Sequence, residues 1–217
     1  MRTISVHQIA FAKPGRGWKR WPSRLPLLCL IPALSWACSQ GNGLSDLSLP
    51  GPGTDRVRPF QTPGVKAHVF LFTRADCPVS NRYLPEIRRL KETYGPRGVA
   101  FWRVYPDPDI SGAAMRQHGQ DFAIDIPALR DPSHRLVEAA GVSITPEAAV
   151  YLPEGRLVYR GRIDDRYIEF GKYRRVPTRH DLEEVLRDVI GGRPPAFRAT
   201  RAVGCYIADL RPRGAAP

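Results

Sequence analysis

The chain has 217 residues, enough for one ordinary globular domain with appendages, because a second full domain would leave both hydrophobic cores thin. A hydrophobic content of 42% and a charged content of 25% exclude a largely disordered chain. The net charge of +12 falls to +6 once the six basic residues that precede the first acid, Asp46, are set aside. Because no aromatic-interleaved basic stripe or groove-reading helix is present, the sequence argues against nucleic-acid binding, while the remaining charge suits acidic partners or membrane surfaces.

Residues 1–38 have the layout of an export signal. A basic stretch ending at Arg24 precedes an apolar run, Leu25 to Ala37, which is too short for a comfortable membrane span. Cys38 resembles the lipidated cysteine of bacterial lipoproteins, although the two residues before Ala37 depart from that motif. We interpret the segment as a signal peptide or lipoprotein leader, which predicts an exported protein, periplasmic or tethered to the outer face of the membrane through Cys38. An uncleaved signal anchor, or a start codon placed too early, is the alternative.

The next segment, residues 39–63, is rich in Gly, Pro, Ser and Asp and predicts a flexible linker. The folded domain is expected at 64–192, beginning with a strand at 67–72 that is rich in strand formers and buried on both faces. A helix starts at Val79, where apolar residues fall at helical spacing, and Pro85 is expected to kink it.

The later elements alternate between strands and helices. A strand at 99–105 comes first, followed by a helix with Ser111 as its N-cap, a short strand at 128–131 and a helix capped by Ser133. An antiparallel hairpin of strands 148–152 and 157–163 follows. The last helix carries an apolar stripe from Leu182 to Ile190 and begins after Thr178. This order predicts an α/β fold with a central mixed sheet and helices on both faces. The tail, residues 193–217, is apolar enough to pack back on the domain.

The residues around Cys77 indicate chemistry. Pro78 favours the first turn of a helix, so the thiol is expected at a helix N-terminus, where free amides and the helix dipole stabilise a thiolate. Arg74 and Arg82 would add positive potential there, whereas Asp76 would oppose it or accept a proton. Without this context a lone cysteine is more often a small buried hydrophobe.

Three motifs carry a resemblance to a known family: Asp76-Cys-Pro-Val-Ser-Asn81, Thr145-Pro146 and Gly161-Arg-Ile-Asp-Asp165. Together with the order of elements over about 65–192, they resemble the thioredoxin-like redoxin family, including its alkyl hydroperoxide reductase and thiol-specific antioxidant branch. The resemblance implies a thioredoxin-like fold in which Cys77 is the attacking thiol. It also implies that Pro146 is a cis-proline facing Cys77, and that Pro78, Thr145 and Pro146 contact the substrate.

The sequence departs from that family at the expected second thiol. Ser80 stands where thioredoxins have the second cysteine of Cys-x-x-Cys, so Cys77 has no neighbouring resolving thiol. Peroxiredoxins carry threonine three residues before the attacking cysteine, and Arg74 stands here instead. Beyond the leader, Cys205 is the other thiol, and it is expected either to resolve an intermediate on Cys77, to pack structurally or to pair with another chain.

The sequence therefore predicts a thiol–disulfide oxidoreductase that acts on protein thiols and disulfides or on peroxide, with no organic cofactor. A peroxiredoxin-like peroxidase, a redox-inactive binding module and a copper-binding accessory factor remain alternatives, the last using Cys77, Cys205 and His134. Asp164 and Asp165 are expected in a solvated charge cluster, and Tyr167 to Arg175 is a candidate partner surface. The sequence predicts no oligomeric state.

Overall fold

The computed structural model describes residues 43–208. The predicted leader with Cys38 lies outside the described residues, as do 39–42 and 209–217. Within the described part of the chain, no helix is both long and apolar enough to cross a membrane.

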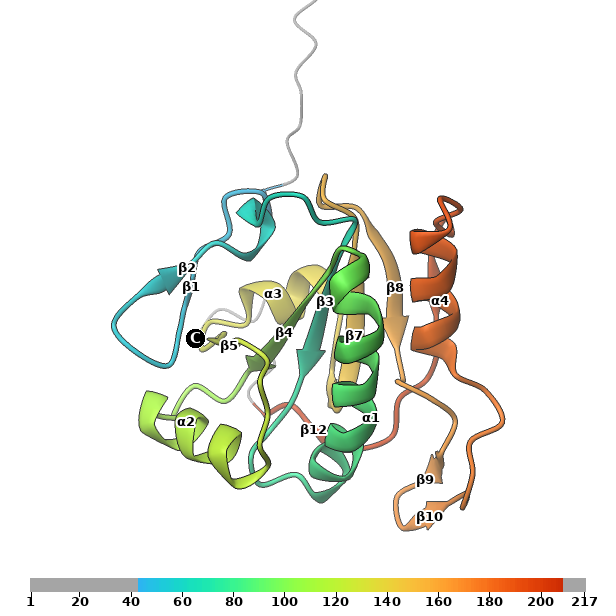
Figure 1. The fold of residues 1–217 in the computed structure, drawn as a ribbon. Coiled ribbons are helices and arrows are strands. Elements are labelled where there is room, and N and C mark those ends of the chain that lie inside the picture. The colour runs from blue at the N-terminus through green and yellow to red at the C-terminus, as the bar shows by residue number, and fades with distance from the viewer. Residues whose placement is uncertain (1–42, 209–217) are drawn as a thin grey trace, which may run out of the picture. The chain divides into compact units, whose positions relative to one another are not determined.

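A six-stranded mixed sheet organises the domain (Figure 1). Its strands are β3 (Ala67–Phe72), β4 (Val99–Tyr105), β5 (Ala128–Arg130), β7 (Glu147–Tyr151), β8 (Leu157–Gly161) and β11 (Arg198–Ala199). Their spatial order is β11-β8-β7-β3-β4-β5. β3 pairs in parallel with β4 and antiparallel with β7, and β7 pairs antiparallel with β8. The predicted mixed sheet with an antiparallel last hairpin is confirmed.

Helices cover both faces of this sheet, with α1 and α4 on one side and α3 on the other (Figure 1). They are α1 (Pro78–Tyr94), α2 (Gly112–Asp121), α3 (Arg135–Ala140) and α4 (Asp181–Ile190), with 3-10 turns η1 (Pro59–Gln61) and η2 (Gly95–Arg97). Successive side chains of β3 point to opposite faces of the sheet. Val69 and Leu71 pack with α1 and α4, while Phe70 and Phe72 pack with α3. The helix α1 continues through Pro85.

The helix caps agree with the sequence at one position and differ at two. Ser111 caps α2 by accepting a hydrogen bond from the Ala114 amide. The first three amides of α3 donate to the buried carboxylate of Asp131 and not to the predicted cap, Ser133. Thr178 does not cap α4, because its hydroxyl and amide both donate to Asp165.

The part of the predicted linker between residues 43 and 63 packs on the domain instead of extending as a tether. Its strands β1 (Leu49–Pro50) and β2 (Arg56–Val57) pair antiparallel. The side chains of Leu47, Leu49 and Phe60 are buried in the cluster on the α3 face. Three buried apolar side chains are enough to hold a segment whose average composition is that of a linker.

The tail folds back on the domain, as predicted. β11 pairs in parallel with β8, and β12 (Cys205–Tyr206) pairs antiparallel with β6 (Ile144–Thr145). Ala202 and Ile207 are buried on either side of β12. A small hairpin of β9 (Tyr167–Glu169) and β10 (Lys172–Tyr173) lies between β8 and α4 in the chain.

Candidate active site

Cys77 occupies the N-cap position of α1, and Pro78 is the first residue of the helix. The chain arrives from the buried strand β3, and the first helical hydrogen bond runs from the Asn81 amide to the Cys77 carbonyl at 3.1 Å. Proline suits this position because its missing amide would have no partner there and its φ is already helical. The predicted placement of the thiol at a helix start is confirmed.

The tail brings the sulfur of Cys205 to the sulfur of Cys77. The two residues are 128 positions apart in the sequence, and their Sγ atoms lie 2.7 Å apart as free thiols. A disulfide bond is about 2.05 Å long, so bond formation needs only a small further approach. Of the fates open to Cys205 from sequence, the structure therefore favours contact with Cys77.

The loop that contains Thr145 and Pro146 forms the third part of the site, next to Cys77 and Cys205. The Thr145-Pro146 peptide bond is cis. The Thr145 carbonyl oxygen lies 3.4 Å from Cys77 Sγ, and Thr145 is the direct strand partner of Cys205. The Thr145 hydroxyl also donates to the Cys205 carbonyl at 3.4 Å. The structure thus brings together all five residues that the sequence nominated, and the strand position beside Thr145 is taken by the protein's own tail.

The pKa values of the two thiols are shifted in opposite directions. Burial acts to raise the pKa of Cys77, but hydrogen bonds from Cys205 and from the hydroxyl and amide of Ser80 together lower it. Among the described residues the buried Ser80 hydroxyl has no other hydrogen-bond partner. Burial and the neighbouring Cys77 raise the pKa of Cys205 to about 11. Deprotonation of this coupled pair therefore begins at Cys77, while Cys205 keeps its proton.

The Cys77 sulfur is covered in this conformation. Cys77 is 1% exposed, whereas Cys205 is partly exposed. The surroundings of the Cys77 sulfur are not purely apolar, since a thiol, a carbonyl oxygen and a hydroxyl face it. Access of a large substrate to Cys77 therefore requires the segment around Cys205 to move.

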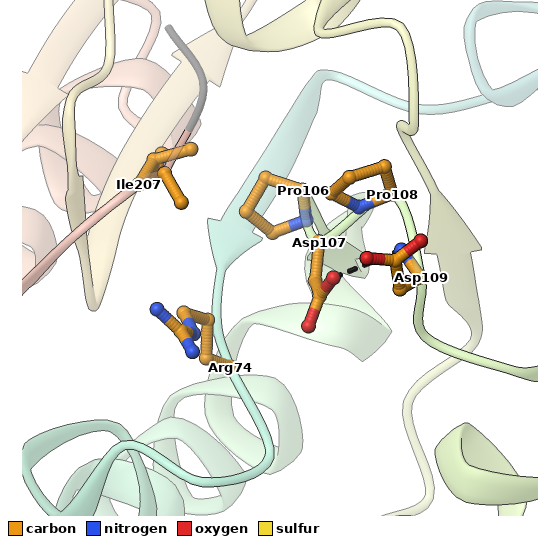
Figure 2. Close-up of a pocket in the computed structure, with 7 residues that line it drawn as sticks. Arg74, Pro106, Asp107, Pro108, Asp109 and Ile207 are labelled. Carbon is orange, nitrogen blue, oxygen red and sulfur yellow. Dashed lines mark hydrogen bonds between the residues drawn. The ribbon is translucent and has the colours of Figure 1, made fainter.

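The predicted cations bind other side chains, and Arg74 is close enough for its charge to act on Cys205. Arg74 forms a two-bonded ion pair with Asp76, at 3.1 and 2.8 Å, and Arg82 lies over the ring of Tyr173. Figure 2 shows Arg74 and Ile207 bordering a cavity of about 120 Å³ whose other wall is the loop 106–109. This cavity touches both the Cys77 loop and the tail, the two segments that meet at the sulfurs.

A buried polar network supports the Cys77 loop, and sequence reasoning missed it. The Asn81 amide group donates to the Ala75 carbonyl at 2.9 Å, and its oxygen lies 3.0 Å from His118 Nε2. His118 Nδ1 lies 2.6 Å from the Tyr105 hydroxyl, which accepts a hydrogen bond from the buried Arg103. Asn81 belongs to the motif that carries the family resemblance, and its place in that motif was the signal that could have revealed its role. Its partners in the network come from β4 and α2.

The candidate copper ligands do not form a three-ligand cluster. His134 Nε2 lies 2.8 Å from the Pro106 carbonyl oxygen. Within residues 43–208, three potential ligand atoms come within 4.8 Å of one another at Glu86, His180 and Glu183. The Arg89 guanidinium binds both of those glutamates and compensates part of their charge.

Asp164 and Asp165 are buried, which corrects the expected solvated cluster. They are 1% and 6% exposed. Asp164 accepts a hydrogen bond from the Tyr83 hydroxyl at 2.6 Å, and Asp165 binds the hydroxyl and amide of Thr178. They fasten the end of β8 to α1 and to the segment before α4, because buried carboxylates need such partners.

The chain is similar to known proteins in sequence and in fold. The Redoxin family profile matches residues 40–176, a range that includes Cys77 and Pro146 and ends before Cys205. No curated protein matches. A hypothetical protein from Sinorhizobium meliloti 1021 superposes with a TM-score of 0.63 at 23% identity, covering 74% of this chain and 89% of that one.

An uncharacterised conserved protein from Geobacillus kaustophilus gives a TM-score of 0.62 at 22% identity, covering 74% of this chain and 87% of that one. A secreted Mycobacterium tuberculosis disulfide oxidoreductase, described as homologous to Escherichia coli DsbE, gives 0.48 at 13% identity, covering 70% and 98%. The profile covers well over half of the chain, and the sheet and helices have the matching arrangement. The chain belongs to the Redoxin family and has a thioredoxin-like fold.

Proposed function

We propose that this protein is a thiol–disulfide oxidoreductase in which Cys77 attacks the substrate and Cys205 resolves the intermediate. The observation that carries the proposal is the pair of sulfurs 2.7 Å apart, with Cys77 at the start of α1. Family membership supports the role of Cys77. The role of Cys205 rests on the geometry alone, because the family match ends at residue 176.

The reaction consists of two exchanges. The Cys77 thiolate attacks one sulfur of a substrate disulfide, forming a mixed disulfide and releasing the other substrate sulfur as a thiolate. Cys205 then attacks the Cys77 sulfur of this intermediate and transfers its proton to the departing thiol. The Cys77–Cys205 disulfide forms, and the substrate gains two electrons and two protons, one proton from Cys205 and one taken from solvent by the thiolate released in the first exchange. The raised pKa of Cys205 keeps it protonated while Cys77 makes the first attack.

The loop around β6 provides the proposed binding position for the substrate. In this conformation β12 pairs with Thr145, and the same backbone groups would bind an extended substrate segment beside Pro146 and Pro78 once the tail has moved. The pairing spans only two residues, so its release has a low cost. Protein disulfides are therefore the proposed substrates.

We also propose export, with Cys38 as a lipid attachment site. The support is the leader-like sequence of residues 1–38. Incorporation of labelled fatty acid into the full chain, lost in Cys38→Ala, tests the anchor. Absence of label in the parent chain would contradict the anchor and leave soluble export to be decided by fractionation.

The test of the oxidoreductase uses three proteins: the parent chain, Cys77→Ser and Cys205→Ser. Disulfide mapping of protein purified without reductant is expected to show a Cys77–Cys205 bond. Reduction of insulin disulfides with dithiothreitol as donor should be lost in Cys77→Ser, whereas Cys205→Ser should accumulate a mixed disulfide on Cys77. Full activity of Cys77→Ser would contradict the proposal, and Cys77-dependent peroxide consumption without disulfide exchange would assign the protein as a peroxidase instead.

A further inference from the structure

A groove borders Cys205 but not Cys77. It has a volume of about 500 Å³ and lies between β6, β9 and the tail. Its lining includes Ile144, Ile168, Phe170, Arg201, Cys205 and Tyr206. A molecule in this groove contacts Cys205, which is one of its lining residues.

The wall of the groove is unusually apolar for exposed surface. Phe170 is 72% exposed, Tyr206 is 77% exposed and Ile168 is 41% exposed. Phe170 lies at the turn between β9 and β10, and Tyr206 follows Cys205 directly. Clustered exposed aromatic side chains beside a reactive group are typical of a protein-contact surface.

Exposed basic residues in the groove and on the adjoining hairpin segment outnumber the acidic ones. Arg201 lines it, and Lys172 and Arg175 follow Phe170 on the hairpin segment. All three are exposed and have no ion pair within residues 43–208, and Glu169, which also lines the groove, is the one exposed acid between residues 167 and 175. The surface is thus complementary to an acidic partner.

We propose that the reductant of the Cys77–Cys205 disulfide is a dithiol protein with an acidic and apolar contact surface, which binds in this groove and attacks the sulfur of Cys205. The inference rests on the proposed function and adds to it the point at which electrons enter. The helix-start cysteine, Cys77, is then the sulfur that leaves and not the sulfur that is attacked.

The donor reduces the Cys77–Cys205 disulfide in two thiol–disulfide exchanges. The donor thiolate forms a bond to Cys205 Sγ, the Cys77–Cys205 bond breaks, and its electron pair leaves on Cys77 as a thiolate. The second donor thiol, deprotonated, then attacks the first donor sulfur and releases Cys205, which takes up the proton. The donor ends as a disulfide, and the protein regains a Cys77 thiolate beside a Cys205 thiol.

Two independent observations favour attack at Cys205. Cys77 is 1% exposed and Cys205 is partly exposed, so an incoming thiolate meets Cys205 first. Cys77 also has the lowered pKa of the pair, and the sulfur with the lower pKa is the better leaving group. Accessibility and leaving-group chemistry therefore both favour attack on Cys205, with Cys77 as the leaving sulfur.

The decisive experiment traps the first intermediate. Full-length oxidised protein is mixed with reduced glutathione, quenched in acid within seconds and alkylated in denaturant before mass spectrometry. We expect glutathione on Cys205 and the alkyl group on Cys77. Glutathione on Cys77, or shared equally, overturns the inference while leaving the proposed function intact. If no Cys77–Cys205 disulfide exists to be reduced, the proposed function itself fails.

A second experiment tests the groove with two synthetic peptides that each contain one cysteine flanked by leucines, with glutamates in one peptide and lysines in the other. The acidic peptide is expected to open the disulfide about tenfold faster at low salt, with the difference lost at high salt. Phe170→Ser should slow the acidic peptide roughly fivefold. Phe197→Ser, which removes an aromatic of 53% exposure outside the groove, should leave the rate unchanged. Equal rates for both peptides, or equal effects of both variants, overturn the assignment of the partner surface.

Discussion

Gly204 lies so close to the backbone of Thr145 that a Cβ on Gly204 would stand 2.0 Å from the Thr145 carbonyl oxygen. Only a residue without a side chain permits this approach, and the approach positions the next residue, Cys205, opposite Thr145. Sequence reasoning passed over Gly204 because a glycine beside a cysteine has many ordinary explanations.

Gly204→Ala should therefore separate the two sulfurs. We expect the rate of Cys77–Cys205 disulfide formation under mild oxidation to fall by about tenfold or more, because small displacements of reacting groups have large effects. Gly53→Ala is the control, since a Cβ there meets nothing within 4 Å. A wild-type rate of disulfide formation in Gly204→Ala would show that β12 can shift without cost to the site.

Ser80→Ala should raise the pKa of Cys77. Burial already acts against the thiolate, and the Ser80 hydroxyl is one of the groups that offset it. The measurement is the rate of iodoacetamide modification of Cys77 against pH in the reduced protein, read by mass spectrometry. The midpoint is expected to move to higher pH in Ser80→Ala and to stay in place in Ser133→Ala, which alters an exposed serine. An unchanged midpoint in Ser80→Ala would remove the hydroxyl from the account of the thiolate.

His68 should make the fold sensitive to acid. It is fully buried between Phe60 and Phe70, neither ring nitrogen has a hydrogen-bond partner within residues 43–208, and burial lowers its pKa to about 4. Its contribution to stability is complete above the unfolded pKa of 6.5 and is lost as the pH falls toward 4, because only the unfolded chain takes up the proton. This one group adds a slope of at most about 1.4 kcal/mol per pH unit in that window.

Replacement by an apolar side chain removes that slope. In His68→Leu, the free energy of unfolding from urea titrations should fall less steeply between pH 6.5 and 4 than in the parent protein. At pH 7 the variant is expected to be as stable or more so, since two buried nitrogens without partners are removed. Parallel stability curves for the two proteins would contradict the prediction.

Asp181 should be the most important acid of α4. Its buried carboxylate accepts hydrogen bonds from Arg162 at 2.7 Å and from Arg198 at 2.6 Å, and Arg198 belongs to the tail strand β11. Asp181→Ala leaves two half-buried arginines without this partner, and we expect a loss of about 2–4 kcal/mol. Asp188→Ala, on the same helix but exposed, should change stability by less than about 0.5 kcal/mol.

The same variant tests how the tail is held. Because Arg198 precedes Cys205 on the tail, Asp181→Ala is also expected to slow formation of the Cys77–Cys205 bond. Stability and oxidation rate are measured by urea titration and by non-reducing mass spectrometry. A destabilised Asp181→Ala that oxidises at the parental rate would show that β12 alone positions Cys205.

Features that depend on consecutive residues could be predicted from the sequence. The run at 67–72 matches β3 at both ends, and Pro78 after Cys77 marks the start of α1. These predictions succeeded because strand propensity, the fixed φ of proline and helical spacing act over a few neighbouring residues. The same local information was sufficient to place the thiol where a thiolate is stabilised.

Features that depend on distant partners were decided by the tertiary structure. Cys205 meets Cys77 because β12 pairs with β6, and neither strand is long enough to be recognised alone. Asp164 and Asp165 are buried because α1 and the segment before α4 cover them. In each case the deciding free energy comes from contacts between segments far apart in the chain, which composition and periodicity do not record.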